Sequence, residues 1–177
     1  MTPPKAFYLF TSGFLPLAGL AHSSEFHLNL IPARQTLEIA PQCEIKIAGD
    51  KRIIKSNGIP DHEVGRFPNR SNPNGIQAQN YRYEVSLKPK LARETAVLVR
   101  QPFGIALNGV LFDPGTAEFF QRDRKSEWNY EALSGAVKLG LDHNHAHVQP
   151  NGAYHYHGLP SKLFEMLSGG EQVMTLI

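Results

Sequence analysis

The stretch DHNHAHVQPNGAYHYHG, residues 142–158, decides the fold prediction for this chain. Two alternating runs of residues flank the segment Pro150-Asn151-Gly152. Proline holds φ at about −65° and glycine accepts a positive φ, so this segment suits a three-residue hairpin loop. We therefore predict two adjacent antiparallel strands, over 145–149 and 153–157.

The same stretch contains five of the eight histidines in the chain. Alternate side chains of a strand share a face, and the predicted loop places His147 opposite His155. Directly opposed Cβ atoms lie about 4.5–5.5 Å apart, so paired imidazoles can converge on one metal ion. A two-residue turn at Asn151-Gly152 would shift the register by one and divide the histidines between the faces. The three-residue loop instead predicts a face that carries His145, His147, His155 and His157.

The opposite face of the predicted hairpin is apolar and suits a protein core, since it carries Ala146, Val148, Tyr154 and Tyr156. Three interpretations of the histidine face are open: a metal site, a solvated face without a ligand, and metal-free acid–base chemistry. We favour the metal site, because histidine on a merely solvated strand lowers its β propensity without a compensating gain. Imidazole suits several transition metals, and the lack of a thiolate pair favours Zn or Cu.

Two further histidines are weaker candidates for the site. His143 lies one pair beyond the opposed histidines. His62 lies in the loop sequence IPDHEVG, where a histidine is usually a surface residue and a ligand or acid–base role is the alternative. The carboxylates of Asp113 and Asp142 could orient imidazole N–H groups, although turn and capping chemistry explains both more simply. The predicted metal ligands are therefore His145, His147, His155, His157, His143 and His62.

Short period-two and β-branched segments recur along the rest of the chain, separated by proline, asparagine and glycine. This spacing is typical of a mainly β domain, an antiparallel β sandwich or barrel. One or two short helices are expected, over 161–167 with Ser161 as N-cap and over 130–140. The predicted strands outside the hairpin are 26–31, 36–40, 43–48, 51–56, 81–87, 96–99 and 104–112, the last with a turn at Asn108-Gly109.

The composition fits one globular domain with a core, since 41% of the 177 residues are hydrophobic. The first residues, MTPPKAFYLFTSGFLPLAGLAHS, place Lys5 before an apolar run that ends on small residues, as in a secretory signal peptide. We predict a signal peptide over 1–21 and a single β domain over 22–177, secreted or periplasmic. The apolar run is short and interrupted, so no stable membrane span is expected after cleavage.

Charge and cysteine content exclude several function classes. The formal net charge is +2 and forms no basic patch, so no nucleic-acid partner is expected. Cys43 is the only cysteine, which excludes an internal disulfide framework, and its alternation with Ile45 and Ile47 predicts a buried strand position. No serine lies in a nucleophile-elbow context, and no phosphate-binding glycine loop is present. The oligomeric state is left open.

The segment HAHVQPNGAYHYHGLP resembles the signature of the YHYH family, exported proteins that carry the tetrapeptide found here at residues 154–157. The segments SNGIPDHEVGRFPN, NPNGIQ, GIALNGVLFDP and WNYEALSG are also similar to this family. The resemblance runs from about Lys51 to Leu167 and implies a YHYH-like domain whose histidine cluster is the functional centre. Family members continue into a further segment rich in glycine, proline and tyrosine, so we expect a domain that is C-terminally truncated relative to the family.

We predict an exported metal-binding domain that binds or carries Zn or Cu through the histidine cluster. The first alternative is a metalloenzyme, hydrolytic with Zn and oxidative with Cu or Fe, whose catalytic residues the sequence does not identify. A catalytic metal needs an open coordination position, so three histidines beside a cleft would favour an enzyme and four would favour binding alone. The second alternative is a metal-free β-sandwich module whose ligand is a small molecule or glycan.

Overall fold

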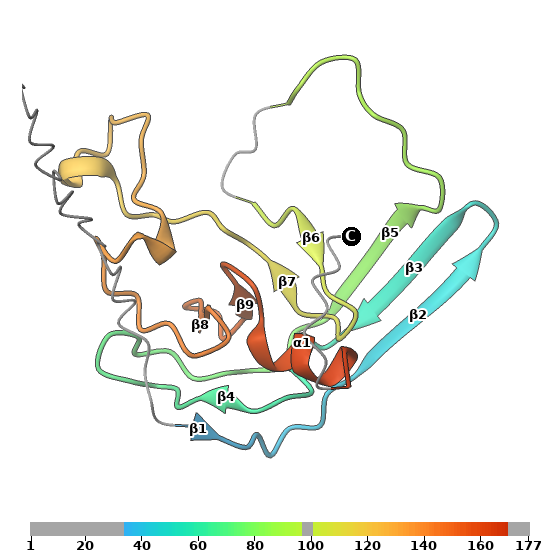
Figure 1. The fold of residues 1–177 in the computed structure, drawn as a ribbon, viewed down its shortest axis with the longest axis horizontal. Coiled ribbons are helices and arrows are strands. Elements are labelled where there is room, and N and C mark those ends of the chain that lie inside the picture. Colours follow the sequence, from blue (N-terminus) through green and yellow to red (C-terminus); the bar gives the residue numbers. More distant parts are fainter. Residues whose placement is uncertain (1–33, 97–100, 170–177) are drawn as a thin grey trace, which may run out of the picture.

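The computed structural model describes residues 34–96 and 101–169, which are built around three sheets (Figure 1). The predicted signal peptide, 1–21, and the predicted strand 26–31 lie outside the described residues, as does nearly all of the predicted strand 96–99. Among the helices in the described residues, none is long and apolar enough to cross a bilayer.

A mixed sheet carries the histidine hairpin. Its strands, in spatial order, are β6 (Gly104–Ile105), β7 (Leu111–Phe112), β9 (Tyr154–Tyr156) and β8 (Ala146–Val148). β8 is antiparallel to β9, whereas β7 runs parallel to β9 on its other side. The strand that carries the YHYH tetrapeptide is therefore central and is hydrogen-bonded along both edges.

Two further sheets are antiparallel. β2 (Cys43–Ala48), β3 (Lys51–Ser56) and β5 (Tyr81–Ser86) form a sheet with β3 in the middle, and β1 (Arg34–Gln35) pairs with β4 (Val64–Gly65). No sheet closes into a barrel in the part of the chain that the structure describes. The prediction of a mainly β fold is confirmed, as a set of antiparallel and mixed sheets.

The strand predictions differ in accuracy. The segments 43–48 and 51–56 coincide with β2 and β3, and the predicted strand 81–87 ends one residue earlier as β5. The segment 104–112 is a short hairpin of β6 and β7 closed at Asn108-Gly109, where Gly109 has a φ of 82°. The strand predicted over 36–40 is wrong, because only the two preceding residues find a partner strand, which is β4.

Of the two predicted helices, one is confirmed and one is wrong. α1 (Ser161–Leu167) has the predicted bounds. The segment 130–140 contains only the 3-10 turn η2 (Ala132–Ser134), after which Gly135 adopts a left-handed φ of 75°. A second 3-10 turn, η1, spans Phe120–Arg122. Gly135 therefore ends the helical turn, whereas the prediction had continued a helix through this residue.

The start of α1 is stabilised from the histidine stretch. Ser161 is not the N-cap; Pro160 occupies that position and offers no side-chain hydrogen bond. Instead, the side-chain oxygen of Asn144 accepts the N–H of Lys162 at 3.0 Å. A residue between two histidines thus satisfies one of the free N–H groups at the helix start.

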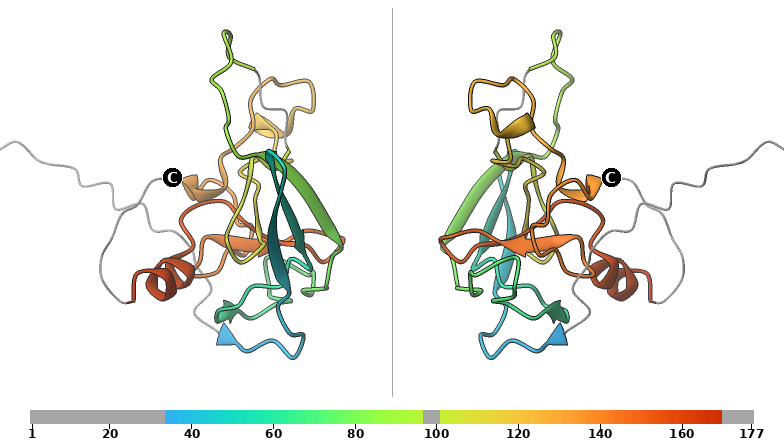
Figure 2. Two further views of the ribbon diagram at one scale, coloured as in Figure 1. Left: turned by 90° about the vertical axis from the view of Figure 1, so that its right-hand side faces the viewer. Right: turned by 90° about the vertical axis from the view of Figure 1, so that its left-hand side faces the viewer.

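The core lies beneath the hairpin, as the apolar pattern predicted. Figure 2 shows α1, in red, and the β2–β3–β5 sheet toward opposite sides of the view. Cys43, predicted to be buried, is exposed, because β2 is the outer strand of that sheet. The buried residues of the core cluster are Val64, Phe67, Ala106, Val110, Ala146, Val148, Tyr154, Tyr156 and Leu163.

Candidate metal centre

The hairpin closes with the predicted register. His147 is opposite His155, and the pairs on either side are Ala146 with Tyr156 and Val148 with Tyr154. This register confirms the three-residue loop and excludes the two-residue turn. The opposed histidines therefore share a face, and the tyrosines share the other.

The loop requires a glycine for two reasons. Gly152 has a φ of 84°, which residues with a Cβ adopt at a cost. A Cβ on Gly152 would also lie 2.6 Å from the Cβ of Gln77, whose N–H donates to the Gly152 carbonyl at 2.9 Å. The loop closes through the N–H of Gln149, which donates to the Ala153 carbonyl at 2.9 Å. Local turn chemistry and a long-range contact thus fix the same register.

Three histidines converge through their Nε2 atoms. The Nε2 atom of His157 lies 3.0 Å from that of His155 and 3.1 Å from that of His147. In a tetrahedral zinc site, nitrogens at about 2.0–2.1 Å from the ion lie about 3.3–3.4 Å from one another. A small outward movement of the rings would therefore admit one ion. We call these three residues the histidine triad.

Backbone carbonyls fix the tautomers of two triad rings. The Nδ1 atoms of His147 and His155 lie 3.0 Å and 3.3 Å from the carbonyl oxygens of Leu139 and Ala153. A carbonyl only accepts, so each neutral ring carries its hydrogen on Nδ1 and a lone pair on Nε2. Metal-binding histidines are commonly oriented in this way by a backbone carbonyl. Both lone pairs point to the Nε2 atom of His157.

His157 completes the triad from a buried position. Its Nδ1 atom is buried and makes no hydrogen bond within the described residues. The pKa of His157 is lowered to about 4, mainly by burial and also by the neighbouring charge of His147, against the opposing effect of the Pro114 carbonyl. Although that carbonyl favours the protonated ring, its geometry falls short of a hydrogen bond.

The triad rings are neutral at neutral pH. Burial lowers the pKa of His155 well below its usual value, and the neighbouring charges of His147 and His157 lower it further. Burial also lowers the pKa of His147, against the effect of the Leu139 carbonyl. Neutral imidazole is the form that binds metal, so the rings need lose no proton to do so.

A cleft of about 370 Å³ opens onto the triad. Its walls are the loop segments 71–74 and 115–118, together with Leu139 and the start of the hairpin loop. The side-chain amides of Asn72 and Asn74 both donate to the Val148 carbonyl at 2.9 Å, which ties one wall to β8. An ion on the triad would therefore face a solvent-accessible space with a coordination position to spare.

His145 does not join the triad, although the sequence placed it on the same face. It has a φ of 53°, which turns its side chain off the strand, and its Nδ1 atom donates to the Leu159 carbonyl at 2.7 Å. The preceding turn causes this conformation, since the N–H of His145 donates to the Asp142 carbonyl at 3.0 Å. The predicted face of four histidines is corrected to a group of three.

His143 and His62 also lie outside the triad. The Nε2 atom of His143 is 3.3 Å from the Asn144 amide nitrogen. His62 contacts the tyrosine face of β9: its Nδ1 atom donates to the Glu63 carbonyl at 2.9 Å, and its Nε2 atom accepts from the Tyr156 hydroxyl at 2.6 Å. Both nitrogens of His62 are therefore engaged on the side of β9 away from the triad.

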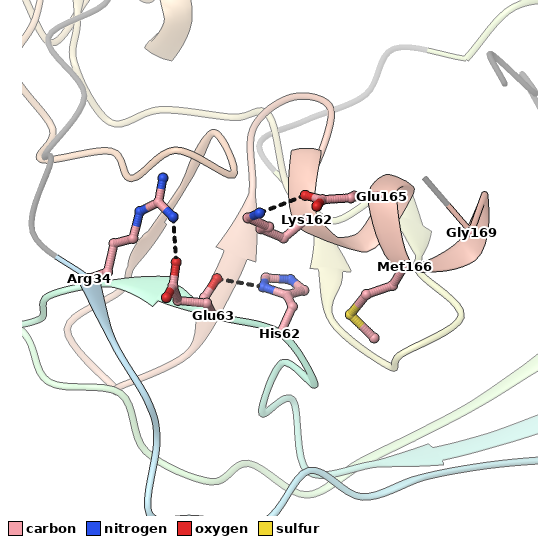
Figure 3. Close-up of a pocket in the computed structure, with 7 residues that line it drawn as sticks. All are labelled: Arg34, His62, Glu63, Lys162, Glu165, Met166 and Gly169. Atoms are coloured by element: carbon pink, nitrogen blue, oxygen red, sulfur yellow. Dashed lines mark hydrogen bonds and ion pairs between the residues drawn. The ribbon is translucent and has the colours of Figure 1, made fainter. Parts of the chain in front are cut away.

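His62 borders a separate pocket of about 630 Å³ (Figure 3). Its charged residues form two ion pairs, Arg34 with Glu63 at 2.8 Å and Lys162 with Glu165 at 2.6 Å. Burial lowers the pKa of His62. This pocket thus combines a neutral histidine with charges that are already paired.

The buried acid of the stretch is structural. The Asp142 carboxylate accepts the Gly65 N–H, the Asn144 N–H and the Tyr154 hydroxyl, each at 2.8 Å. Among the described residues it bonds no imidazole, and neither does Asp113, whose carboxylate accepts from the Gln149 amide at 3.1 Å. The simpler interpretation of both residues, turn and local hydrogen bonding, is the one the structure shows.

Sequence reasoning missed the importance of the buried amides. Asn144 and Asn108 are 0% and 5% exposed. Asn108 donates to the Tyr156 hydroxyl at 2.9 Å and also bonds Asp61 at 3.0 Å, so its role extends beyond the turn that the sequence predicted. The sequence signals these roles only by the presence of an asparagine in the stretch 142–158 and another in the segment 104–112.

Comparison with known proteins places this chain in a family. Residues 82–177, more than half of the chain, match the family described as YHYH protein. No curated protein and no solved structure matches the chain. The matched region begins in β5 and contains the cleft segment 115–118 and the whole hairpin. With the tetrapeptide on its central strand, the chain belongs to the YHYH protein family.

Proposed function

We propose that this protein is an exported metal-binding protein that holds one Zn or Cu ion on His147, His155 and His157. The observation that carries the proposal is the convergence of three Nε2 atoms, in which those of His155 and His147 lie 3.0 Å and 3.1 Å from that of His157. These atoms form the one group of at least three potential metal-binding side chains within the described residues.

A metal-free triad leaves its hydrogen-bonding capacity poorly satisfied. With the hydrogens of His147 and His155 held on Nδ1, only the Nε2 atom of His157 can carry a hydrogen between the rings. That single hydrogen can serve one of the two nitrogen contacts, and the other would bring two lone pairs together at about 3 Å. One cation satisfies all three nitrogens at once.

The donor set favours Zn or Cu. Three neutral imidazoles suit both ions, and the sole cysteine, Cys43, is exposed on β2 rather than grouped with the triad. The export part of the proposal is supported by the family resemblance and by the signal-peptide pattern of residues 1–21. The ion would be carried or used outside the reducing compartment of the cell.

A metalloenzyme is the second candidate, and the cleft is the observation that favours it. Three protein ligands and an open position are typical of catalytic zinc sites, where the metal supplies a hydroxide from bound water near neutral pH. The segments 71–74 and 115–118 would then hold the substrate beside the ion. Glu118, which is exposed, is the acidic residue that borders the cleft.

The test is titration of the metal-free full chain with Zn and with Cu, by calorimetry and by native mass spectrometry. We expect one ion per chain. His147→Ala, His155→Ala and His157→Ala should each weaken binding on the order of 10²-fold or more, above the roughly 10–100-fold typical of residues that only orient ligands.

His145→Ala is the matched control, since it lies in the same stretch but outside the triad, and it should bind normally. The proposal is overturned if the wild type binds neither ion, or if His145→Ala abolishes binding while His147→Ala leaves it intact.

A further inference from the structure

A second hollow adjoins the cleft that opens onto the histidine triad. It has a volume of about 460 Å³ and is lined by the segments 118–119 and 121–122, Tyr130 and the segment 136–139. Glu118 and Leu139 line both hollows. The Leu139 carbonyl is also the group that holds the Nδ1 hydrogen of His147. The second hollow is therefore a direct neighbour of the triad.

Two cations border this second hollow without an ion-pair partner in the part of the chain that the structure describes. Arg122 and Lys138 both line it, and neither forms an ion pair within the described residues. Glu118 is the one acidic residue in the lining, so positive charge exceeds negative charge there. The pocket beside His62 differs, because both of its cations are already paired with carboxylates (Figure 3).

The backbone beneath Arg122 is held in a costly conformation. Gln121 and Arg122 have successive φ values of 53° and 61°, in the left-handed region that disfavours residues with a Cβ. The surrounding loop holds them there: the Arg122 N–H donates to the Phe119 carbonyl at 3.0 Å, and the Tyr130 N–H donates to the Glu118 carbonyl at 2.8 Å. Strain of this kind collects at ligand-binding segments of proteins.

Lys138 reaches the same hollow from the other wall. It is bonded directly to Leu139, and consecutive Cα atoms are only about 3.8 Å apart. Lys138 is therefore the direct neighbour of the residue whose carbonyl orients the His147 ring. Because Glu118 and Leu139 line both hollows, a ligand held by Lys138 and Arg122 would lie next to the cleft that opens onto the triad.

We propose that a small molecule with an oxyanion group, a carboxylate or a phosphate, binds across the two hollows. Its oxyanion accepts hydrogen bonds from Arg122 and Lys138, which are suited to such groups. A second oxygen of the same molecule occupies the open coordination position of the ion on the triad. This inference rests on the proposed function, because it requires the ion.

The test is calorimetric titration of the zinc-loaded full chain at low ionic strength with three probes: succinate, glycerol 3-phosphate and, as the uncharged comparison, glycerol. We expect binding of at least one oxyanion and none of glycerol, and the tighter probe identifies the preferred oxyanion. Arg122→Gln and Lys138→Gln should each weaken oxyanion binding about 10-fold, the loss expected for a hydrogen bond between charged groups.

Lys125→Gln is the matched control, because it removes a cation from the same loop at a position that does not line the hollow. It should bind the probe as the wild type does, and all three variants should keep the zinc affinity of the wild type. Zinc removal should weaken oxyanion binding at least 10-fold, by loss of one direct ligand contact.

The inference is overturned if neither oxyanion binds the zinc-loaded chain, if binding survives both Arg122→Gln and Lys138→Gln, or if it is equal with and without zinc. Failure of the proposed function is a separate result, since it is measured as the absence of zinc binding to the same wild-type sample.

Discussion

Strand β9 and the residue directly after it carry His155 and His157 on one face and Tyr154 and Tyr156 on the other, and all four side chains are buried. The tyrosine hydroxyls are fully engaged, that of Tyr154 with Asp142 and that of Tyr156 with His62 and Asn108. The histidines instead contact other histidines, with one nitrogen of His157 left without a partner among the described residues. Both faces are thus buried, but they differ in hydrogen bonding. The tyrosine hydroxyls have their partners, whereas the histidine face suits a ligand.

This difference separates folding from binding. A buried polar group that is fully hydrogen-bonded contributes to a specific structure, whereas one that lacks partners lowers stability. The tyrosine face should therefore determine the stability of the hairpin. The histidine face should determine what the protein binds.

The largest effect is expected in the thermal stabilisation by zinc, which should depend on the histidine face and not on the tyrosine face. A ligand at 100 times its Kd stabilises the folded state by about 2.7 kcal/mol. His157→Ala should abolish this zinc-dependent rise in the thermal midpoint, because the ring contacts both other triad members. Tyr156→Phe, one residue away on the other face, should keep the rise. A loss of the zinc response in both variants would remove the distinction between the faces.

The next effect concerns the loop that aligns the faces. Gly152→Ala should lower the free energy of unfolding by about 2 kcal/mol or more, because it combines a left-handed φ with a close approach to Gln77. Gly49→Ala is the matched control, since Gly49 also has a positive φ, of 62°, but no atom within 4 Å of the added Cβ. Denaturant unfolding of both variants checks this, and equal losses would show that the Gln77 contact is unimportant.

A smaller effect is expected within the tyrosine face. Tyr154→Phe removes one donor from the Asp142 carboxylate but leaves two backbone N–H donors at 2.8 Å. The loss should be about 1–2 kcal/mol in the free energy of unfolding, with zinc affinity unchanged. Parallel denaturant and zinc titrations measure both quantities. A variant of normal stability and weakened zinc affinity would reverse the assigned roles.

The smallest expected effect is that of a pH change near neutrality on zinc affinity. Burial lowers the pKa of all three triad rings, that of His157 from 6.5 to about 4. The rings are thus unprotonated well below the usual histidine range, so zinc affinity should change little between about pH 7.5 and 6 and fall below about pH 5. An affinity that already falls steeply through pH 6.5 would contradict the buried, neutral triad.

The same shifts predict how the metal-free protein responds to acid. Between pH 6.5 and about 4 the unfolded chain binds a proton on His157 that the folded chain does not, and the lowered pKa values of His147 and His155 act in the same direction. The free energy of unfolding contributed by these rings is therefore fully present above pH 6.5 and is lost as the pH falls toward 4. Denaturant unfolding of the metal-free chain across this range measures it, and a constant value would argue against the buried rings.

Sequence reasoning succeeded where the determinants are local. The loop Pro150-Asn151-Gly152 fixes the register of the hairpin through its own backbone conformation, so the pairing of His147 with His155 followed from the sequence. Strands β2 and β3 and helix α1 were predicted with their observed bounds for the same reason: alternation or helical spacing is visible within each segment.

It failed where contacts join distant segments. His145 follows the strand pattern in sequence, yet the turn at Asp142 rotates it away, and Asp142 is itself held by Gly65, 77 residues earlier. The cleft walls at 71–74 and 115–118 meet the triad through contacts between segments remote in sequence. The parallel pairing of β7 with β9 is equally non-local. A group of three histidines beside an open cleft, rather than a face of four histidines, could be recognised only in the folded chain.

The most direct measurement is nitrogen NMR of the histidine rings in the metal-free and zinc-loaded full chain. Our account predicts that zinc shifts the Nε2 resonances of three rings, those of His147, His155 and His157, while their Nδ1 atoms stay protonated. The resonances of His62, His143 and His145 should not show metal coordination. A fourth ring bound through His145, or rings that titrate with acid but do not respond to zinc, would contradict the account.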